Sequence, residues 1–213
     1  RCSRLFAETA ASVFCGNGIK AYIFSSLRPT PELSFAVRKL GCTAGVVVTA
    51  SHNPAEYNGY KVYWSDGGQV VPPHDTLIIK EVNSVSEIKS VPVSEAGALF
   101  SVIGKEIDDA YLEAVKNVSL RPELLRAEGK NLRIVYTPLH GAGRVPVEQA
   151  LSSLGIQVIT VPEQAEPDGE FPTVKFPNPE EASALALALA LGKEKKASLV
   201  MGTDPDSDRL GIA

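Results

Sequence analysis

The pattern over residues 132–161 constrains the fold more than any other part of the sequence. Two segments rich in β-branched and aromatic residues, Leu132–Tyr136 and Ile156–Val161, flank a turn at 138–143 and a helical pattern over 145–154. A strand, a helix and a second strand in this order usually form a right-handed crossover between parallel strands. The sequence therefore predicts an α/β fold.

Helical and extended segments also alternate in the first half of the chain. Gly45–Thr49 contains three consecutive valines, a pattern typical of a strand that is buried on both faces. A polar loop over 50–58 follows this strand directly. Residues 75–84 and 106–117 have helical patterns, whereas segment 85–104 is less regular.

We expect two consecutive α/β units, in which mixed or parallel sheets are sandwiched by helices. Charge rises and apolar periodicity fades around residues 121–130, which predicts a join between a first unit over 1–126 and a second unit over 130–213. In the second unit, Asn178 is a helix-capping residue followed by Pro179. We therefore expect a helix from this point through the following leucine- and alanine-rich stretch.

Composition limits the partners of the chain. Its formal net charge is −4 and Lys/Arg-rich blocks are absent, which argues against nucleic acid or an anionic membrane as a partner. The longest apolar run, 182–191, is far shorter than the ~20 residues of a membrane span. Three cysteines without a C-x-x-C pair, and no signal peptide, favour a reduced cytoplasmic protein. An anionic small molecule would be bound by local groups such as a metal, and the oligomeric state stays open.

Three carboxylates follow the predicted strand Ser198–Met201. Asp204, Asp206 and Asp208 are two residues apart, and like charges this close repel unless a positive group lies among them. Mg²⁺ and Ca²⁺ prefer such oxygen ligands. An EF-hand loop does not fit, because Arg209 occupies the position that needs glycine and a strand precedes the loop. A solvated acidic turn is the alternative, but Arg209 favours a metal site that also binds a phosphate.

The polar loop contains Ser51, within Thr49-Ala50-Ser51-His52-Asn53-Pro54, just past the valine-rich strand. Ligands of α/β sheets bind at the carboxyl ends of the strands. Taken alone, this sequence also fits a helix cap or an Asx-type turn. The sequence has neither G-x-S-x-G nor G-x-x-x-x-G-K-[ST], which excludes a hydrolase elbow and a nucleotide P-loop. His52 is adjacent to Ser51, so a contact between the two is geometrically awkward, and His140 stays open as a base.

Several motifs together resemble the α-D-phosphohexomutase family, in its bacterial-type phosphoglucomutase/phosphomannomutase branch. The two most specific are the serine motif with Tyr57-Asn58-Gly59-Tyr60-Lys61 after it, and Asp204-x-Asp206-x-Asp208-Arg209. Three further stretches are similar to the family: Arg28–Pro31, Thr137–Gly143 and Phe176–Glu180. The resemblance covers nearly the whole chain. It implies the first of four family domains, without its N-terminal strand, and part of the second.

The resemblance assigns the central roles to one serine and three aspartates. It implies that Ser51 is the phosphoserine. It also implies that Mg²⁺ is bound by Asp204, Asp206, Asp208 and a phosphoryl oxygen on Ser51. This chemistry suits phosphoryl transfer, which depends on alignment and on cancelling negative charge.

The resemblance also implies roles for four surrounding residues. Lys61 and Arg209 lie near the phosphoryl group, and Lys61 is a candidate proton shuttle. His52 is a neighbour within the catalytic site. Arg1 corresponds to the arginine that ends the first-strand motif of the family, and it would bind substrate.

The implied reaction interconverts hexose 1-phosphate and hexose 6-phosphate, and glucose is the expected sugar. The phosphoserine transfers its group to the sugar phosphate, hexose 1,6-bisphosphate turns around, and a phosphoryl group returns to Ser51. A phosphomannomutase, a phosphopentomutase and a glucosamine enzyme are alternatives, as is a non-catalytic sugar-phosphate binder. Because both ends of the sequence look cut, we expect an excerpt with little or no mutase turnover.

Overall fold

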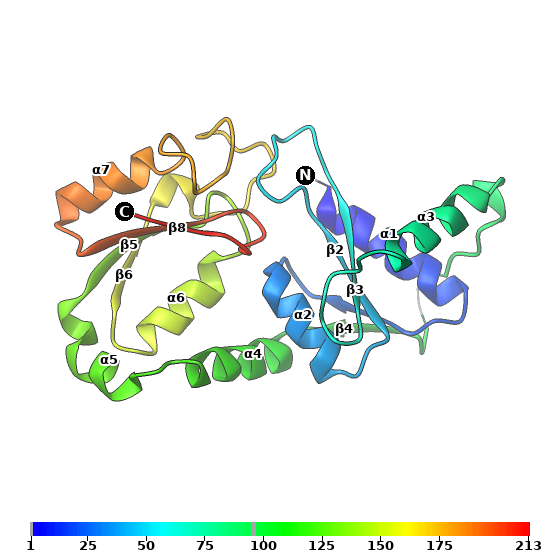
Figure 1. Ribbon diagram of the computed structural model, residues 1–213, viewed down its shortest axis with the longest axis horizontal. Coiled ribbons are helices and arrows are strands. Elements are labelled where there is room, and N and C mark those ends of the chain that lie inside the picture. The colour runs from blue at the N-terminus through cyan, green and yellow to red at the C-terminus, as the bar shows by residue number, and fades with distance from the viewer. Residues whose placement is uncertain (1, 95–96) are drawn as a thin grey trace.

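Two α/β halves lie side by side in the computed structural model, which describes residues 2–94 and 97–213 (Figure 1). The N-terminal half runs to residue 117, and the C-terminal half starts at residue 122. Both halves contain helices and strands, and the sheets are one parallel pair, one antiparallel pair and one mixed four-stranded sheet. The α/β fold predicted from the sequence is confirmed.

The N-terminal half contains two separate pairs of strands. Its elements are, in order, α1 (Ser3–Gly16), β1 (Ala21–Phe24), α2 (Thr30–Lys39), β2 (Ala44–Val48), β3 (Tyr60–Trp64), α3 (His74–Ser84), a 3₁₀ turn (Ile88–Ser90), β4 (Phe100–Ile103) and α4 (Lys105–Asn117). β1 pairs parallel with β4, and β2 pairs antiparallel with β3. The polar loop that contains Ser51 therefore connects the two strands of one hairpin.

The sequence of α2 accounts for its limits. Pro31 lies in its first turn, Glu32 lies near the positive N-terminus, and Arg38 and Lys39 lie near the negative C-terminus. Gly41 follows with a left-handed φ of 63°, a conformation that is costly for residues with a Cβ atom. These signals place the start of α2 at Thr30, which faces the C-terminal half.

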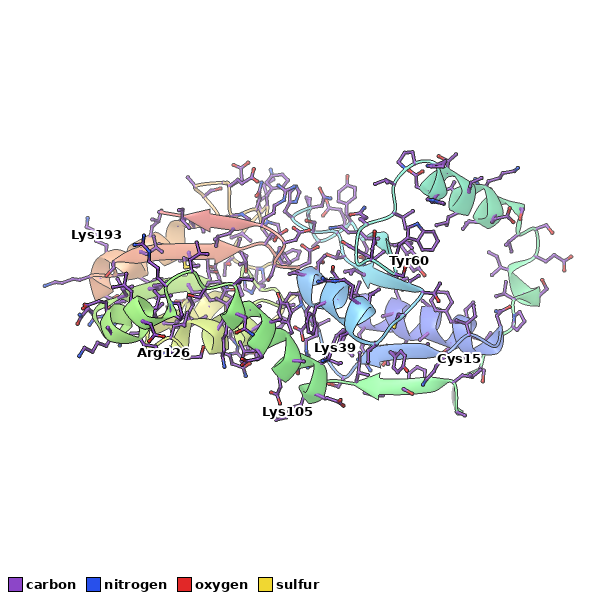
Figure 2. All side chains as sticks on the ribbon, turned by 60° about the horizontal axis from the view of Figure 1, so that its bottom comes forward. Cys15, Lys39, Tyr60, Lys105, Arg126 and Lys193 are labelled. Carbon is purple, nitrogen blue, oxygen red and sulfur yellow. The ribbon has the colours of Figure 1, made fainter. Side chains whose placement is uncertain are left out.

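One expectation for the N-terminal half is wrong. Val46–Val48 lie in a strand as predicted, but they are only partly buried, so the packing on β2 does not cover both of its faces completely. The segment 85–104 contains β4, whose four residues pair with the whole of β1. By contrast, the helix expected over 75–84 is present as α3, which projects from the rest of the half and buries none of its described side chains (Figures 1 and 2).

One four-stranded sheet forms the centre of the C-terminal half. Its elements are α5 (Pro122–Glu128), a 3₁₀ turn (Gly129–Asn131), β5 (Arg133–Thr137), α6 (Arg144–Ser152), β6 (Gln157–Thr160), a 3₁₀ turn (Pro162–Gln164), α7 (Ala186–Lys195), β7 (Leu199–Thr203) and β8 (Leu210–Ile212). The strand order is β6-β5-β7-β8, and only the β7–β8 pair is antiparallel. The strand–helix–strand unit predicted over 132–161 is confirmed as β5-α6-β6.

Apolar residues from the centre of this sheet and from α7 form its core. Val135, Val161, Ala188 and Val200 are buried together, and partly buried Leu191 packs against them. This burial of branched side chains on β5 and β7 supplies the main driving force for the half. The loops after β5 and β7 therefore follow directly on the two strands that contribute to this core.

The helix expected from Asn178 begins later than predicted. Asn178 Oδ1 accepts a hydrogen bond from the Glu180 N–H at 3.1 Å, as a capping residue does, but turns follow and α7 begins at Ala186. Leu185 is buried over Gly202 of β7, where a Cβ atom would collide with the leucine side chain. This packing fixes the chain in turns before the helix starts.

The helix α5 occupies most of the segment 121–130, in which the sequence predicts a join between the two units. Pro122 and Glu123 in its first turn are ordinary helix-start signals.

Among the helices that the structure describes, none combines the length and the apolar character needed to cross a membrane.

The two halves meet in a region that we call the joint. On one side lie α2, α4 and the loop over 49–58, and on the other lie α6 and the loops after β5 and β7 (Figure 1). The Thr30 N–H at the start of α2 donates to the Asp206 carbonyl oxygen at 2.8 Å. α4 contacts both α2 and α6. The loops with the predicted site residues converge at this joint.

Candidate active site at the joint

Ser51 lies at the joint with its hydroxyl directed at an aspartate of the other half. Its Oγ donates a hydrogen bond to Asp204 Oδ2 at 3.0 Å, across 153 residues of sequence. Its backbone N–H donates to Thr49 Oγ1 at 2.8 Å, and its φ is 53°, in the left-handed region. A left-handed serine held by a neighbouring side chain is a strained position of the kind found in functional loops.

The three aspartates form a compact group, which we call the aspartate cluster (Asp204, Asp206 and Asp208). One oxygen from each carboxylate lies within 4.8 Å of the others. Asp204 is fully buried and Asp206 is 5% exposed, whereas Asp208 is partly exposed. Asp204 Oδ1 accepts hydrogen bonds from the backbone N–H groups of Asp208 at 3.1 Å and Arg209 at 2.9 Å. The loop after β7 thus folds around Asp204.

Lys61 of β3 supplies a positive charge to this cluster. Its Nζ donates to Asp206 Oδ2 at 3.1 Å and to Asp208 Oδ2 at 3.4 Å. Burial would lower the pKa of Lys61, but the charges of Asp206 and Asp208 outweigh it and raise this pKa. Lys61 is therefore protonated at neutral pH and offsets one of the three negative charges.

Burial and crowding shift the pKa values of the two inner carboxyl groups in opposite directions. Burial, followed by hydrogen bonding to Asp206, raises the pKa of Asp204 to about 7. Burial also opposes the charged form of Asp206, but hydrogen bonding to Asp204 and the charge of Lys61 lower its pKa overall. Asp204 therefore gives up its proton only near neutral pH, and a divalent cation beside it would favour the charged form.

The aspartate cluster fits a hard divalent cation. Asp206 Oδ1 is buried and has no hydrogen-bond partner among the described residues. A buried carboxylate oxygen without a partner is costly, and oxygen atoms of this kind are the ligands that Mg²⁺ prefers. With one lysine against three carboxylates, the cluster also has the surplus negative charge that a cation would neutralise.

The remaining residues predicted for the site differ in how close they lie to Ser51 and in their partners. His52 Nδ1 lies 3.2 Å from Ser51 Oγ, so the contact that looked awkward in the sequence exists because Ser51 is left-handed. Arg209 NH1 forms an ion pair with Glu180 at 3.1 Å. His140 Nε2 is hydrogen-bonded to Thr173 Oγ1 at 2.8 Å. Arg1 lies outside the described residues.

A cavity of about 350 Å³ opens beside Ser51. The residues that line it include Asn58, His140, Asp168, Phe171 and Asp206. Asp168 and Phe171 were not predicted from the sequence to lie near Ser51. Both belong to the long connection between β6 and α7. The only signal was the length of that connection, since long ordered connections are usually functional.

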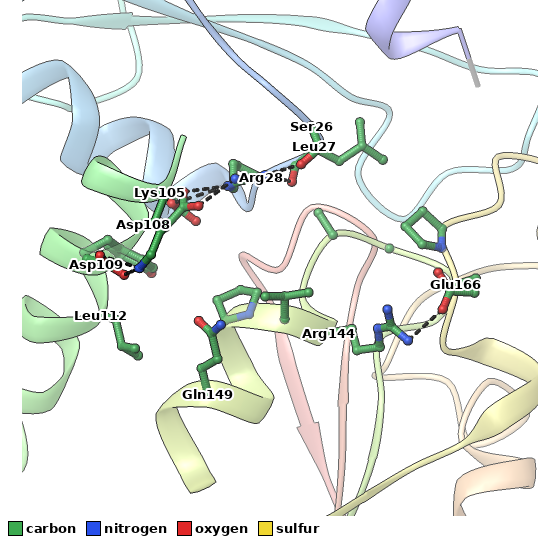
Figure 3. Close-up of a pocket in the computed structure, with 17 residues that line it drawn as sticks. Ser26, Leu27, Arg28, Lys105, Asp108, Asp109, Leu112, Arg144, Gln149 and Glu166 are labelled. Carbon is green, nitrogen blue, oxygen red and sulfur yellow. Dashed lines mark hydrogen bonds and ion pairs between the residues drawn. The ribbon is translucent and has the colours of Figure 1, made fainter. Parts of the chain in front are cut away.

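A second cavity of about 530 Å³ lies along the joint between α2, α4 and α6 (Figure 3). Its charged side chains are paired, since Arg144 binds Glu166 at 2.7 Å and Arg28 binds Asp108 through two hydrogen bonds of 2.7 Å (Figure 3). Glu32, 2% exposed, lies beside them with Oε1 3.7 Å from Arg28 Nε. We call Arg28, Glu32 and Asp108 the Arg28 cluster.

Within the Arg28 cluster, the pKa values of the two acids are shifted in opposite directions. Burial, followed by hydrogen bonding to Asp108, raises the pKa of Glu32 to about 8. Hydrogen bonding to Arg28 lowers the pKa of Asp108. Glu32 is therefore a neutral acid at pH 7, and the charges of Arg28 and Asp108 cancel.

Two sequence profiles of one family match most of the chain. Residues 1–89 match "Phosphoglucomutase/phosphomannomutase, alpha/beta/alpha domain I", and residues 109–213 match domain II of the same family. Each predicted motif lies inside one of these two matches.

Curated relatives agree with these profiles. A Schizosaccharomyces pombe protein named "Probable phosphoribomutase" is 43% identical over 99% of the chain, which covers 37% of that relative. A Haemophilus influenzae protein named "Probable phosphomannomutase" is 41% identical over 99% of the chain and 43% of its own length. The chain thus spans less than half the length of these relatives, and their names differ in the sugar.

A solved structure shares the fold of the whole chain. The crystal structure of a Thermus thermophilus protein, provisionally named a phosphomannomutase, superposes with a TM-score of 0.82 at 28% identity. The match covers 100% of the chain and 46% of that protein. With its two domain profiles, its relatives and this shared fold, the chain belongs to the phosphoglucomutase/phosphomannomutase family.

Proposed function

We propose that the chain supplies the phosphoryl-carrying serine and the metal site of a phosphosugar mutase. The observation that supports this most directly is the 3.0 Å hydrogen bond from Ser51 Oγ to Asp204 Oδ2 within the aspartate cluster. It joins a serine of the N-terminal half to three carboxylates of the C-terminal half. In this proposal, residues 1–126 form the phosphoserine domain and residues 130–213 the metal-binding domain.

The aspartate cluster and Ser51 would together bind Mg²⁺. Asp204, Asp206 and Asp208 each offer one oxygen, and a phosphoryl oxygen on Ser51 would be the fourth ligand. The ion would neutralise part of the charge of a phosphoserine, which is nearly −2 at neutral pH. Lys61 would neutralise another part, because it lies within 3.1 Å of Asp206 and is protonated.

In each transfer, one P–O bond breaks and another forms. The bond between phosphorus and Ser51 Oγ breaks, and a bond to the accepting sugar hydroxyl forms. The hydroxyl loses a proton, and Ser51 Oγ gains one. Lys61 is the proposed proton shuttle for this exchange, and His52, with Nδ1 3.2 Å from Ser51 Oγ, is a second group in contact with the serine. Arg209 is proposed to bind the phosphoryl group, which requires it to leave Glu180.

The proposed substrates are hexose 1-phosphate and hexose 6-phosphate, with hexose 1,6-bisphosphate as the intermediate. Glucose is the proposed sugar, and the names of the relatives make mannose and pentose phosphates the alternatives. Cys2, Cys15 and Cys42 are free thiols, which supports a reducing, cytoplasmic location. Arg1 is proposed as a substrate-binding residue on its sequence resemblance alone.

Mass spectrometry after incubation with glucose 1,6-bisphosphate and Mg²⁺ tests the carrier role. We expect one phosphate on Ser51 in the wild-type protein and none in Ser51→Ala. Ser84→Ala is the matched control, because Ser84 is an exposed serine at the end of α3 and its loss leaves the joint intact. A phosphate that persists in Ser51→Ala would contradict the proposal.

A further inference from the structure

Thr30 contacts the aspartate cluster from the opposite half of the chain. It is the first residue of α2 and is 5% exposed. Its Oγ1 donates a hydrogen bond to Asp206 Oδ2 at 3.0 Å, and its backbone N–H donates to the Asp206 carbonyl oxygen at 2.8 Å. One residue therefore binds both the main chain and the side chain of Asp206, across 176 residues of sequence.

The two oxygens of Asp206 have different surroundings. Oδ2 accepts hydrogen bonds from Thr30 Oγ1 at 3.0 Å and from Lys61 Nζ at 3.1 Å. Oδ1 is buried and has no hydrogen-bond partner among the described residues. Two donors on one oxygen fix the rotation of the carboxylate, and this rotation leaves the other oxygen available.

We propose that Thr30 is a positioning residue that orients Asp206 so that Oδ1 binds the divalent cation. The inference rests on the proposed function, because it requires that the aspartate cluster binds Mg²⁺. Residues that hydrogen-bond a metal-ligating carboxylate fix its orientation, and their loss typically lowers metal affinity by about 10- to 100-fold. Thr30 makes such a contact from the half that contains Ser51, so the orientation of Asp206 depends on how the two halves meet.

A purely structural role for Thr30 is the competing explanation. The hydroxyl bond could serve only to hold the two halves together, in the way that the backbone bond to Asp206 does. The two roles differ in what a valine at this position would change. Valine keeps the backbone bond, the shape and the burial, and removes only the hydroxyl donor. A structural role would then lower stability, whereas a positioning role would lower metal affinity in a protein that is still folded.

The test compares Mg²⁺ affinities of the purified protein by isothermal titration calorimetry. We expect Thr30→Val to weaken Mg²⁺ binding by about 10-fold or more, and Thr30→Ser, which keeps the hydroxyl, to restore the wild-type affinity. Thermal unfolding without Mg²⁺ shows whether each variant is folded. Thr137→Val is the matched control, because Thr137 is an equally buried threonine whose hydroxyl binds the neutral amide of Gln164 at 2.7 Å. We expect this control to bind Mg²⁺ as the wild type does.

Two results would overturn the inference. One is a folded Thr30→Val protein with wild-type Mg²⁺ affinity. The other is a folded Thr30→Ser protein that loses affinity although it keeps the donor, and this outcome decides the matter even if the valine variant does not fold. Failure of the proposed function looks different, because wild type and Asp206→Asn would then bind Mg²⁺ equally, and the positioning role would fail with it.

Discussion

The aspartate cluster and the Arg28 cluster are two groups of buried and partly exposed acids at the same joint, and their negative charges are compensated in different ways. Each contains one buried carboxyl oxygen without a hydrogen-bond partner among the described residues, Asp206 Oδ1 in the first and Glu32 Oε1 in the second. Each also has a basic side chain, Lys61 or Arg28, in contact with its acids.

The difference lies in the balance of charge. In the Arg28 cluster, one arginine forms two hydrogen bonds to Asp108, and Glu32 keeps its proton because its pKa is raised to about 8. In the aspartate cluster, Lys61 contacts Asp206 and Asp208, and at least one carboxylate charge stays uncancelled even when Asp204 keeps its proton. Clustered acids are therefore insufficient evidence for a metal site. A surplus of negative charge that protons and basic side chains leave uncancelled is the better criterion.

The largest expected effect tests whether only one cluster binds metal. Asp206→Asn keeps the shape of the side chain but removes a charge, and we expect Mg²⁺ affinity to fall by more than about 100-fold, because a ligand matters more than the groups that orient it. Asp108→Asn makes the same change in the Arg28 cluster, and its Mg²⁺ affinity should equal that of the wild type. Isothermal titration of both variants gives the answer. Equal losses of Mg²⁺ affinity in Asp206→Asn and Asp108→Asn would show that the two clusters do not differ in metal binding.

The residues of the two clusters were not equally predictable from the sequence. The spacing of Asp204, Asp206 and Asp208 within one short motif already favours a cation site, whereas the role of Ser51 was predicted from the family resemblance. The Arg28–Asp108 contact joins residues 80 positions apart, and the Thr30–Asp206 contact joins residues 176 apart. Such contacts depend on how α2, α4 and the loop after β7 pack together, and a pattern within one element carries no information about that packing.

The same limit explains which parts of the fold were predicted. The β5-α6-β6 unit was correct because its periodicity and connections are local. The predicted burial of Val46–Val48 on both faces was wrong because burial depends on the elements that pack on each face of the β2–β3 hairpin, and a run of valines carries no information about them. The late start of α7 depends on the packing of Leu185 against β7.

The second effect concerns the proton of Glu32. The folded chain holds this proton up to about pH 8, whereas the unfolded chain releases it near pH 4.5, so unfolding releases a proton between these values. Relative to Glu32→Gln, which has no proton to lose, wild-type stability should therefore fall by about 4 kcal/mol as pH rises from about 4.5 to about 8. The groups that face Glu32, namely Arg28, Asp108 and Tyr111, are the same in both proteins.

Urea unfolding of the wild type and Glu32→Gln at several pH values measures this difference, since other titrating groups contribute equally to both proteins. A stability difference that stays constant from pH 5 to pH 8 would show that Glu32 is ionised in the folded chain. The Arg28 cluster would then have surplus charge like the aspartate cluster, and the distinction between the two clusters would disappear.

The smallest effect compares a partly buried ion pair with an exposed one, formed by adjacent aspartates of α4. Asp108→Ala removes both hydrogen bonds to Arg28, whose side chain is 16% exposed, and we expect it to lower the free energy of unfolding by about 2 kcal/mol. Asp109→Ala, the adjacent control, breaks the exposed pair with Lys105, and its effect should stay within about 0.5 kcal/mol. Urea unfolding at pH 7 measures both. If the two variants lost equal stability, Arg28 would not depend on Asp108 to compensate its buried charge, and the charge balance assigned to the Arg28 cluster would be wrong.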